Sequence, residues 1–177
     1  ESLKILVDNA PADDEAHVRA IIRAEFGQPL EELFEEFKLT PIASASIAQV
    51  HMATLRDGTG QRVAVKIQHQ GVDRLILSDL KALKRIVGFC CWLGGERWND
   101  TRRMLESWAK DMVFELDFLH EAQNLREVRA GLQSAGVDVV VPEVLDRWVS
   151  RRAFMMEFCE GFRFTDVNRL VMHGVDR

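Results

Sequence analysis

One strand–turn–strand segment constrains the fold of this chain more than any other feature. Residues 47–55 alternate in polarity, and residues 62–68 do the same with three β-branched members. The sequence DGTG at residues 57–60 separates them, and glycine and aspartate favour the backbone conformations of tight turns. The pattern predicts a β-hairpin and therefore at least one antiparallel strand pair.

Apolar residues at helical spacing precede and follow this hairpin. Residues 14–26 predict a helix before it. Residues 29–37 also have helical spacing, although the part from Phe34 onward fits a strand equally well. Residues 72–93 predict a long helix that ends at Gly94-Gly95.

A second helical stretch runs from about residue 99 to residue 132. It is too long for one ordinary helix, so we expect a break near residues 115–118. Residues 144–149 and 153–158 predict two further strands, and residues 165–173 predict the start of another helix. This order predicts an α+β domain with a mostly antiparallel sheet of about five strands.

Charge and cysteine content exclude several classes of protein. The 23 basic and 28 acidic residues give a net charge of −5, which argues against a nucleic-acid partner. The sparse cysteines, Cys90, Cys91 and Cys159, favour a reducing compartment and buried thiols. The longest apolar run, residues 86–95, is too short to span a membrane, and we expect no targeting segment in this chain.

The entry to the hairpin, PIASASIAQV, has the spacing of a kinase phosphate-binding loop. Ala43, Ala45 and Ala48 occupy the three glycine positions of G-x-G-x-x-G-x-V, and Val50 matches its valine. Alanine restricts the backbone more than glycine does, so the loop should grip a nucleotide differently. We expect Ala45→Gly to change nucleotide preference.

The next strand contains Val63-Ala64-Val65-Lys66, which matches the V-A-I-K pattern of kinases. Its ammonium would lie under the loop, where it can meet phosphate oxygens. Taken alone, the loop match is explained by an ordinary turn of small residues, and the lysine match by a lysine at the edge of a sheet. Both matches in order across one hairpin favour a phosphate site.

A half-buried ammonium needs an anionic partner. Asp117, Glu121 and Asn124 have the spacing of one helix face, among apolar neighbours. A solvated face is the alternative interpretation. With Lys66 available, we predict an ion pair between Lys66 and Glu121.

Four segments together resemble the UbiB-type atypical kinase family, also called the ADCK proteins. They are PIASASIAQVHMA, VAVKIQH, FELDFLHEAQN and MMEFCEGFRFTDV. The resemblance extends from about residue 8 to residue 176. It implies a protein-kinase-like N-terminal lobe with an αC helix and inserted helices that ordinary kinases lack.

The resemblance also implies roles for individual residues. Lys66 and Glu121 would be the catalytic pair, and Glu115 and Asp117 the regulatory E-x-D that contacts a K-x-G-Q segment. Residues 157–161 would be the hinge that holds adenine. The residues implied to bind ATP or ADP are Ala43, Ser44, Ala45, Ser46, Ala48, Val50, Ala64, Lys66, Glu157 and Cys159.

On this pattern, residues 1–177 are a single partial domain. Its expected parts are a helical lead-in (1–33), strands with the loop and lysine (34–68), inserted helices (72–114), the αC helix (115–134), strands and hinge (139–161) and the start of a C-terminal lobe (162–177).

The family resemblance implies atypical kinase or ATPase activity in ubiquinone or related prenyl-lipid biosynthesis. Its setting would be a mitochondrion, a plastid, or the bacterial cytoplasm and inner-membrane face. The apolar stretch 86–93, with Trp92, could contact a membrane or a biosynthetic partner, and packing on the sheet is the equal alternative. A non-catalytic pseudokinase, acting as scaffold or nucleotide sensor, is the competing functional class.

Several family features are missing from this chain. Gln70 replaces a proline, and the K-x-G-Q, catalytic-loop Asp/Asn and D-F-G motifs do not occur. The last two bind magnesium in kinases, so we expect no metal site in these residues. We expect activity from the full-length protein and none from this chain alone.

Overall fold

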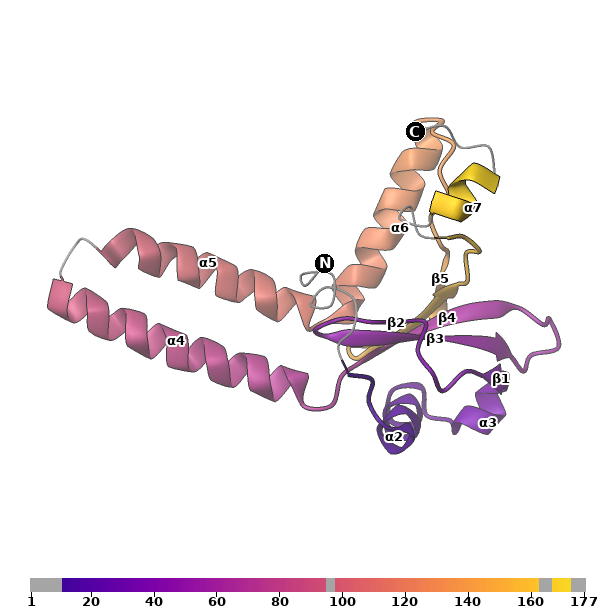
Figure 1. The fold of residues 1–177 in the computed structure, drawn as a ribbon, viewed down its shortest axis with the longest axis horizontal. Coiled ribbons are helices and arrows are strands. Elements are labelled where there is room, and N and C mark those ends of the chain that lie inside the picture. Colours follow the sequence, from indigo (N-terminus) through magenta and orange to yellow (C-terminus); the bar gives the residue numbers. More distant parts are fainter. Residues whose placement is uncertain (1–10, 95–97, 163–166, 173–177) are drawn as a thin grey trace.

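An antiparallel sheet with helices on both faces forms the centre of the computed structural model, which describes residues 11–94, 98–162 and 167–172 (Figure 1). The six strands are β1 (Phe34–Phe37), β2 (Ala43–Ser44), β3 (Ala48–Leu55), β4 (Arg62–Gln68), β5 (Val144–Val149) and β6 (Ala153–Glu157). Their order is β1-β3-β4-β6-β5, and β2 pairs with β3 at the side of this path. The predicted α+β class is confirmed, and the two-residue β2 is the strand that the sequence did not indicate.

The predicted hairpin is formed by β3 and β4, with Val50 opposite Lys66. Its turn contains Gly58 and Gly60, which both have a positive φ that other residues rarely adopt. The carboxylate of Asp57 accepts hydrogen bonds from the backbone and hydroxyl of Thr59. These local bonds fix the register that places Lys66 on the sheet.

The helices of the described residues are α2 (Glu15–Phe26), α3 (Leu30–Leu33), α4 (Val72–Gly94), α5 (Asn99–Glu115), α6 (Phe118–Ser134) and α7 (Val167–Met172). Asp14 caps α2 by accepting from the backbone of His17, and Gly27 ends it with a φ of 75°. The break between α5 and α6 falls where the sequence predicted it, so α6 begins at Phe118 rather than at residue 115.

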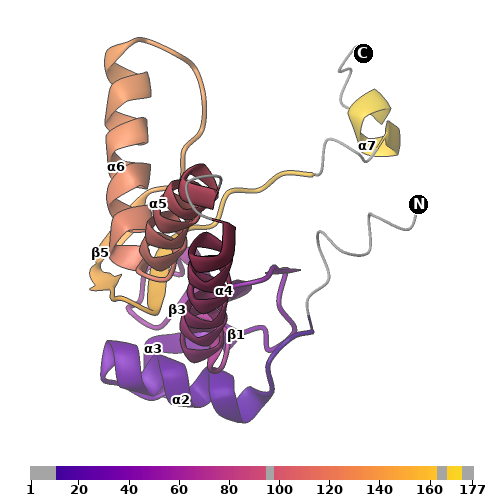
Figure 2. The ribbon, with the colours of Figure 1, turned by 90° about the vertical axis from the view of Figure 1, so that its left-hand side faces the viewer.

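The two faces of the sheet carry separate cores. Val63, Val65 and Ile67 of β4 pack against α2 and α3. Alternate residues of a strand point to opposite faces, so Lys66 lies on the other side, under α6. Figure 2 shows α6 on one side of the sheet and α2 on the other. On the side of α6, Phe118 and Ala122 of this helix pack against Phe154 of β6.

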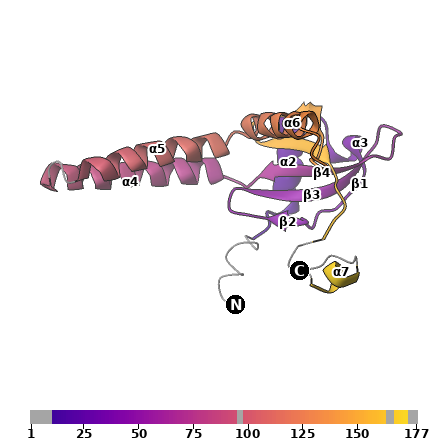
Figure 3. The same cartoon turned by 90° about the horizontal axis from the view of Figure 1, so that it is seen from above.

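Helices α4 and α5 form a long hairpin that projects from the sheet (Figures 1 and 3). The alternative that this insert packs on the sheet is therefore wrong. The hairpin leaves large apolar side chains exposed: Ile86, Phe89, Trp92, Leu93, Met104 and Trp108. Among the described residues, no helix is long and apolar enough to cross a membrane.

Some local predictions need correction. Residues 29–37 divide into α3 and β1, so the strand alternative holds from Phe34 onward. Cys90 and Cys91 are half-buried and Cys159 is exposed, which contradicts the expected buried thiols. Strand β6 ends at Glu157, one residue early. Parts of the predicted lead-in, C-lobe start and final helix, namely residues 1–10, 163–166 and 173–177, lie outside the described residues.

Candidate functional site

Lys66 is held on β4 by neighbours on both sides. It pairs with Val50 of β3 and Phe154 of β6, so the three side chains share one face of the sheet. Its ammonium lies 4.9 Å from the ring centre of Phe118 and 6.0 Å from that of Phe154. Aromatic faces attract cations, so the rings of Phe118 and Phe154 favour a position of the ammonium close to α6.

Glu121 meets the ammonium from the first turns of α6. Its two carboxylate oxygens lie 2.5 and 2.6 Å from Lys66 Nζ, so the ion pair predicted from the sequence is present. The side chain of Lys66 is 21% exposed and that of Glu121 is 40% exposed. The pair is therefore reachable from solvent rather than sealed in the core.

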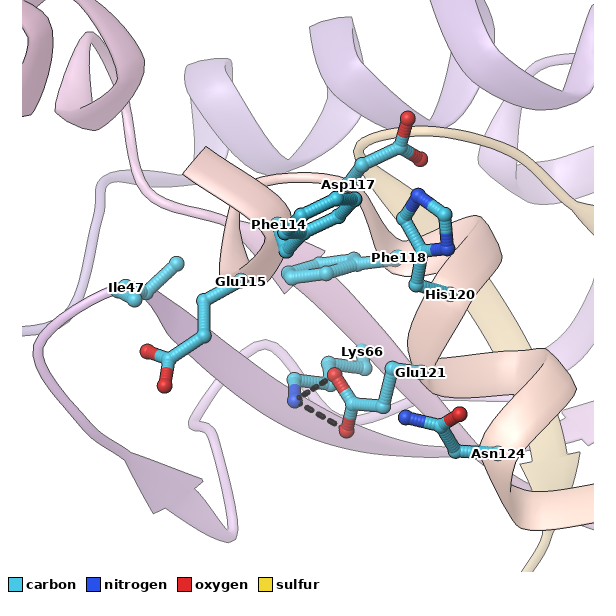
Figure 4. Close-up of a pocket in the computed structure, with 9 residues that line it drawn as sticks. All are labelled: Ile47, Lys66, Phe114, Glu115, Asp117, Phe118, His120, Glu121 and Asn124. Atoms are coloured by element: carbon cyan, nitrogen blue, oxygen red, sulfur yellow. Dashed lines mark hydrogen bonds and ion pairs between the residues drawn. The ribbon is translucent and has the colours of Figure 1, made fainter. Parts of the chain in front are cut away.

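A cavity of about 370 Å³ opens beside this pair (Figure 4). Its volume lies in the range of small-molecule sites. It is lined by Ile47, Lys66, Phe114, Glu115, Asp117, Phe118, His120, Glu121 and Asn124. The residues come from the alanine-rich turn, β4, the end of α5 and the first two turns of α6. Elements distant in sequence thus converge on one ammonium.

The E-x-D carboxylates border this cavity but point in opposite directions (Figure 4). Asp117 accepts from the backbone of Leu119, which caps α6, and from Arg151 Nε at 3.1 Å. Glu115 is exposed at the end of α5. Within the described residues, no group of three acidic, histidine or cysteine side chains could hold a metal ion. Asp117 thus has two structural roles, because it caps α6 and also lines the cavity.

The alanine-rich segment forms a tight turn between β2 and β3. The backbone of Ala45 donates to Ala48 O at 2.9 Å, and Ala43 pairs with Val50. No described residue other than glycine has a positive φ, so alanine suits this turn without strain. Of this segment, Ile47 is the residue that lines the cavity.

Ala64 lies on the same face of β4 as Lys66, whereas the hinge residues lie farther along β6. Glu157 pairs with Val63, three residues beyond the Phe154–Lys66 pair. At about 3.3 Å per residue, this is a separation of roughly 10 Å along the strand. Glu157 and Cys159 do not line the lysine cavity.

A second cavity of about 630 Å³ lies beyond this strand end, lined by Phe158, Glu160, Gly161, Phe162, Arg169 and Met172. Next to it, local burial and the carboxylate of Glu157 raise the pKa of the Cys159 thiol. A raised pKa keeps the thiol protonated near neutral pH, so Cys159 is a weak nucleophile. The sequence-predicted site thus divides between two regions of the sheet.

Sequence reasoning did not select three aromatic lining residues, Phe114, Phe118 and His120. The ring of His120 stands nearly perpendicular to that of Phe114, with their centres 5.0 Å apart, and borders the cavity. The only sign of these residues in the sequence was their apolar character around Asp117 and Asn124. Which way their side chains point depends on the angle between α5 and α6, and the spacing of residues in the sequence does not give that angle.

Comparison with known proteins identifies the relatives of this arrangement. The profile of the ABC1 atypical kinase-like domain matches residues 5–177. The chain belongs to this family. The resemblance stated from the motifs is therefore confirmed.

Relatives come from plants, animals and bacteria. A chloroplastic aarF domain-containing protein kinase of Arabidopsis thaliana is 36% identical over 156 residues, covering 86% of this chain and 22% of the relative. The AarF domain-containing protein kinase 1 of Gallus gallus is 33% identical and covers 99% of this chain and 33% of its own length. UbiB of Marinobacter nauticus is also 33% identical, with 99% and 32% coverage. The chain therefore spans a third or less of these relatives.

A solved structure supports the same fold. Rv3197 of Mycobacterium tuberculosis, determined in complex with erythromycin, matches with a TM-score of 0.70 and 30% sequence identity. The match covers 94% of this chain and 40% of the solved chain. The ABC1 kinase-like fold therefore accounts for nearly the whole chain.

Proposed function

We propose that this chain is the nucleotide-binding lobe of an atypical kinase or ATPase of the UbiB type. The observation that carries the proposal is the bidentate contact of Glu121 with Lys66 at the open cavity. A lysine held in this way presents a fixed positive charge to phosphate oxygens. The family assignment makes a nucleotide the ligand of choice.

The proposed ligand is ATP or ADP with magnesium. Lys66 would hold phosphate oxygens, Glu121 would orient Lys66, and the turn from Ala43 to Ala48 would cover the phosphates. The base would lie near Glu157 and Cys159, with Ala64 between them and the lysine on β4 and Val50 beside the lysine on β3. The roughly 10 Å offset between Phe154 and Glu157 along β6 suits an extended ligand with its phosphates at the lysine.

Magnesium would supply charge neutralisation on the phosphates during transfer. The described residues lack a cluster that could hold a metal ion, so we assign its ligands to the remainder of the full-length protein. The Glu115–Asp117 E-x-D would serve regulation rather than metal binding. The six segments defined in the sequence, from lead-in to C-lobe start, are the proposed domain layout.

At the level of the whole protein, we propose a role in ubiquinone or related prenyl-lipid biosynthesis, supported by the UbiB name of the bacterial relatives. A plastid setting is supported by the chloroplastic relative, and a mitochondrial or bacterial setting follows from the family resemblance. The proposed partners are a biosynthetic protein or a membrane surface that the protein contacts peripherally. We do not propose a nucleic-acid partner.

A pseudokinase scaffold is the second candidate. The projecting α4–α5 hairpin favours it, because large exposed apolar side chains such as Phe89 and Trp92 mark interaction surfaces. In this case nucleotide binding would change shape or partner affinity without turnover. Both candidates use the Lys66 cavity, and they differ in the chemistry that follows.

A magnesium–nucleotide titration of the full-length protein separates these outcomes. Lys66→Ala should lose most of the affinity for ATP and ADP, whereas Lys84→Ala, on the exposed face of α4, should keep it. Absence of ATP and ADP binding by the wild-type protein would refute the nucleotide-lobe proposal. Binding with magnesium-dependent turnover supports the enzyme, and binding without turnover supports the scaffold.

A further inference from the structure

A polar cluster outside the Lys66 cavity reaches the alanine-rich turn. It joins Asp13, which precedes α2, to His69, which follows β4. Their side chains are 17% and 11% exposed, so both lie mostly within the protein. Asp13 lies outside the family segments recognised in the sequence, and His69 is the last residue of the segment VAVKIQH, for which no role was assigned.

The ring of His69 makes its two shortest polar contacts with acceptors. Nδ1 lies 2.7 Å from Asp13 Oδ2, and Nε2 lies 2.9 Å from the backbone oxygen of Ala45. The backbone of His69 also donates to Ile47 O at 2.9 Å. One residue thus holds the turn at two points, on either side of Ser46.

The partners of the ring are suited to hydrogen bonding from both of its nitrogens. The carboxylate of Asp13 and the carbonyl of Ala45 are acceptors, and the hydroxyl of Ser44, 3.5 Å from Nε2, can donate or accept. The ring is therefore tied to the residue before α2 on one side and to the alanine-rich turn on the other.

Asp13 is itself fixed by further bonds. Its backbone donates to Gln49 Oε1 at 2.9 Å, and its Oδ1 lies 3.5 Å from the backbone N–H of Gln70. His17 of α2 is the other titratable group near it, with Nε2 3.8 Å from Asp13 Oδ2. That nitrogen lies closer to Gln68 O, at 3.0 Å, so His17 donates there instead.

We propose that His69, held by Asp13, is a positioning residue for nucleotide binding because it fixes the alanine-rich turn. The proposal rests on the function proposed above. The turn contains no glycine, and phosphate binding by such a turn requires its backbone N–H groups to be preset. The hydrogen bond from His69 to Ala45 O restrains the peptide at the apex of this turn.

The restraint can be measured without nucleotide. In the full-length protein, amide hydrogen exchange at Ala45 should be slow, because the hydrogen bonds of His69 hold the turn. His69→Gln and Asp13→Asn, compared with wild type at the same pH, should each accelerate it about tenfold.

Nucleotide affinity gives the functional readout. Both variants should weaken ATP binding about tenfold, and the double variant should be no weaker than either one. His17→Gln is the matched control, because His17 lies beside the same carboxylate without touching the turn, and it should bind as wild type does. Asp13→Asn tests the restraint independently if His69→Gln fails to fold.

The two proposals fail in different ways. Unchanged Ala45 exchange in both variants would overturn the positioning role while wild-type nucleotide binding persists. Wild-type protein that shows slow exchange at Ala45 but binds no nucleotide would overturn the proposed function. Equal losses in His17→Gln and His69→Gln would also count against a specific role for His69.

Discussion

Glu121 holds Lys66 with both carboxylate oxygens, at 2.5 and 2.6 Å, although its own side chain is 40% exposed. The pair combines the geometry of a buried ion pair with the solvent access of a surface pair. Its contribution to folding should therefore be small, and its main effect should be to fix the direction of the ammonium.

Glu121→Gln tests this separation of roles. The free energy of unfolding in urea should change by about 1 kcal/mol or less, because the exposed pair gains little net energy. ATP affinity should fall, since Lys66 loses its orientation. The exposed neighbour Gln123, changed to Ala, should alter neither quantity. A stability loss above about 3 kcal/mol would mean that the pair behaves as a buried one.

Phe118 should matter far more to stability. It is 1% exposed, and its ring meets Phe154 edge to face at 5.9 Å. Phe118→Ala should lower the free energy of unfolding by about 3–5 kcal/mol, because it leaves a cavity under α6. Phe114→Ala serves as the comparison, since that ring is 56% exposed. Similar losses in both variants would contradict the assignment of Phe118 to the core.

His51 should make the protein sensitive to mild acid. Burial lowers the pKa of His51, although its bond to Lys38 O and the charge of Asp13 oppose the shift. The unfolded chain, with an ordinary pKa of about 6.5, then binds the proton more readily. Stability should be complete above about pH 6.5 and decline as the pH falls through the lowered folded pKa.

His51→Asn removes this titration and can keep the bond to Lys38 O. Urea unfolding between about pH 5 and pH 7.5 should show a flatter profile in this variant than in wild type. The exposed His120, changed to Asn, should leave the profile unchanged. Parallel profiles for wild type and His51→Asn would exclude His51 as the source of acid sensitivity.

Ala45→Gly should alter the balance between ATP and ADP binding. Ala45 donates to Ala48 O within the turn, and its methyl group limits backbone freedom. Glycine adds conformations that approach phosphate differently. Titrations of both nucleotides against the full-length variant measure the ratio of affinities. An unchanged ratio would reject this role for the alanine.

The sequence predicted the parts of the fold that local chemistry decides. The hairpin and the break before Phe118 each follow from residues close together in the chain. The direction of the α4–α5 hairpin does not, because its apolar pattern fits packing on the sheet as well as projection. The two-residue β2 is too short to leave a period in the sequence.

The Lys66–Glu121 contact was predictable because a half-buried lysine on a strand requires an anionic partner. The predicted helix that follows carried acidic residues at a suitable spacing. The same reasoning placed Asp117 beside Glu121 but could not give its bond to Arg151, which depends on the β5–β6 turn. The link from Asp13 to His69 joins residues 56 positions apart and leaves no pattern. Such contacts are decided by tertiary structure.

The junction between α5 and α6 has a mechanical consequence. It consists of Leu116 and Asp117, and Leu116 O is pinned by the amide of the buried Gln68 at 3.0 Å. The 17 residues of α5 extend about 25 Å from this point. This junction lies about one helical turn before Glu121. A change in the direction of the hairpin at this point would therefore also displace the first turn of α6, from which Glu121 reaches Lys66.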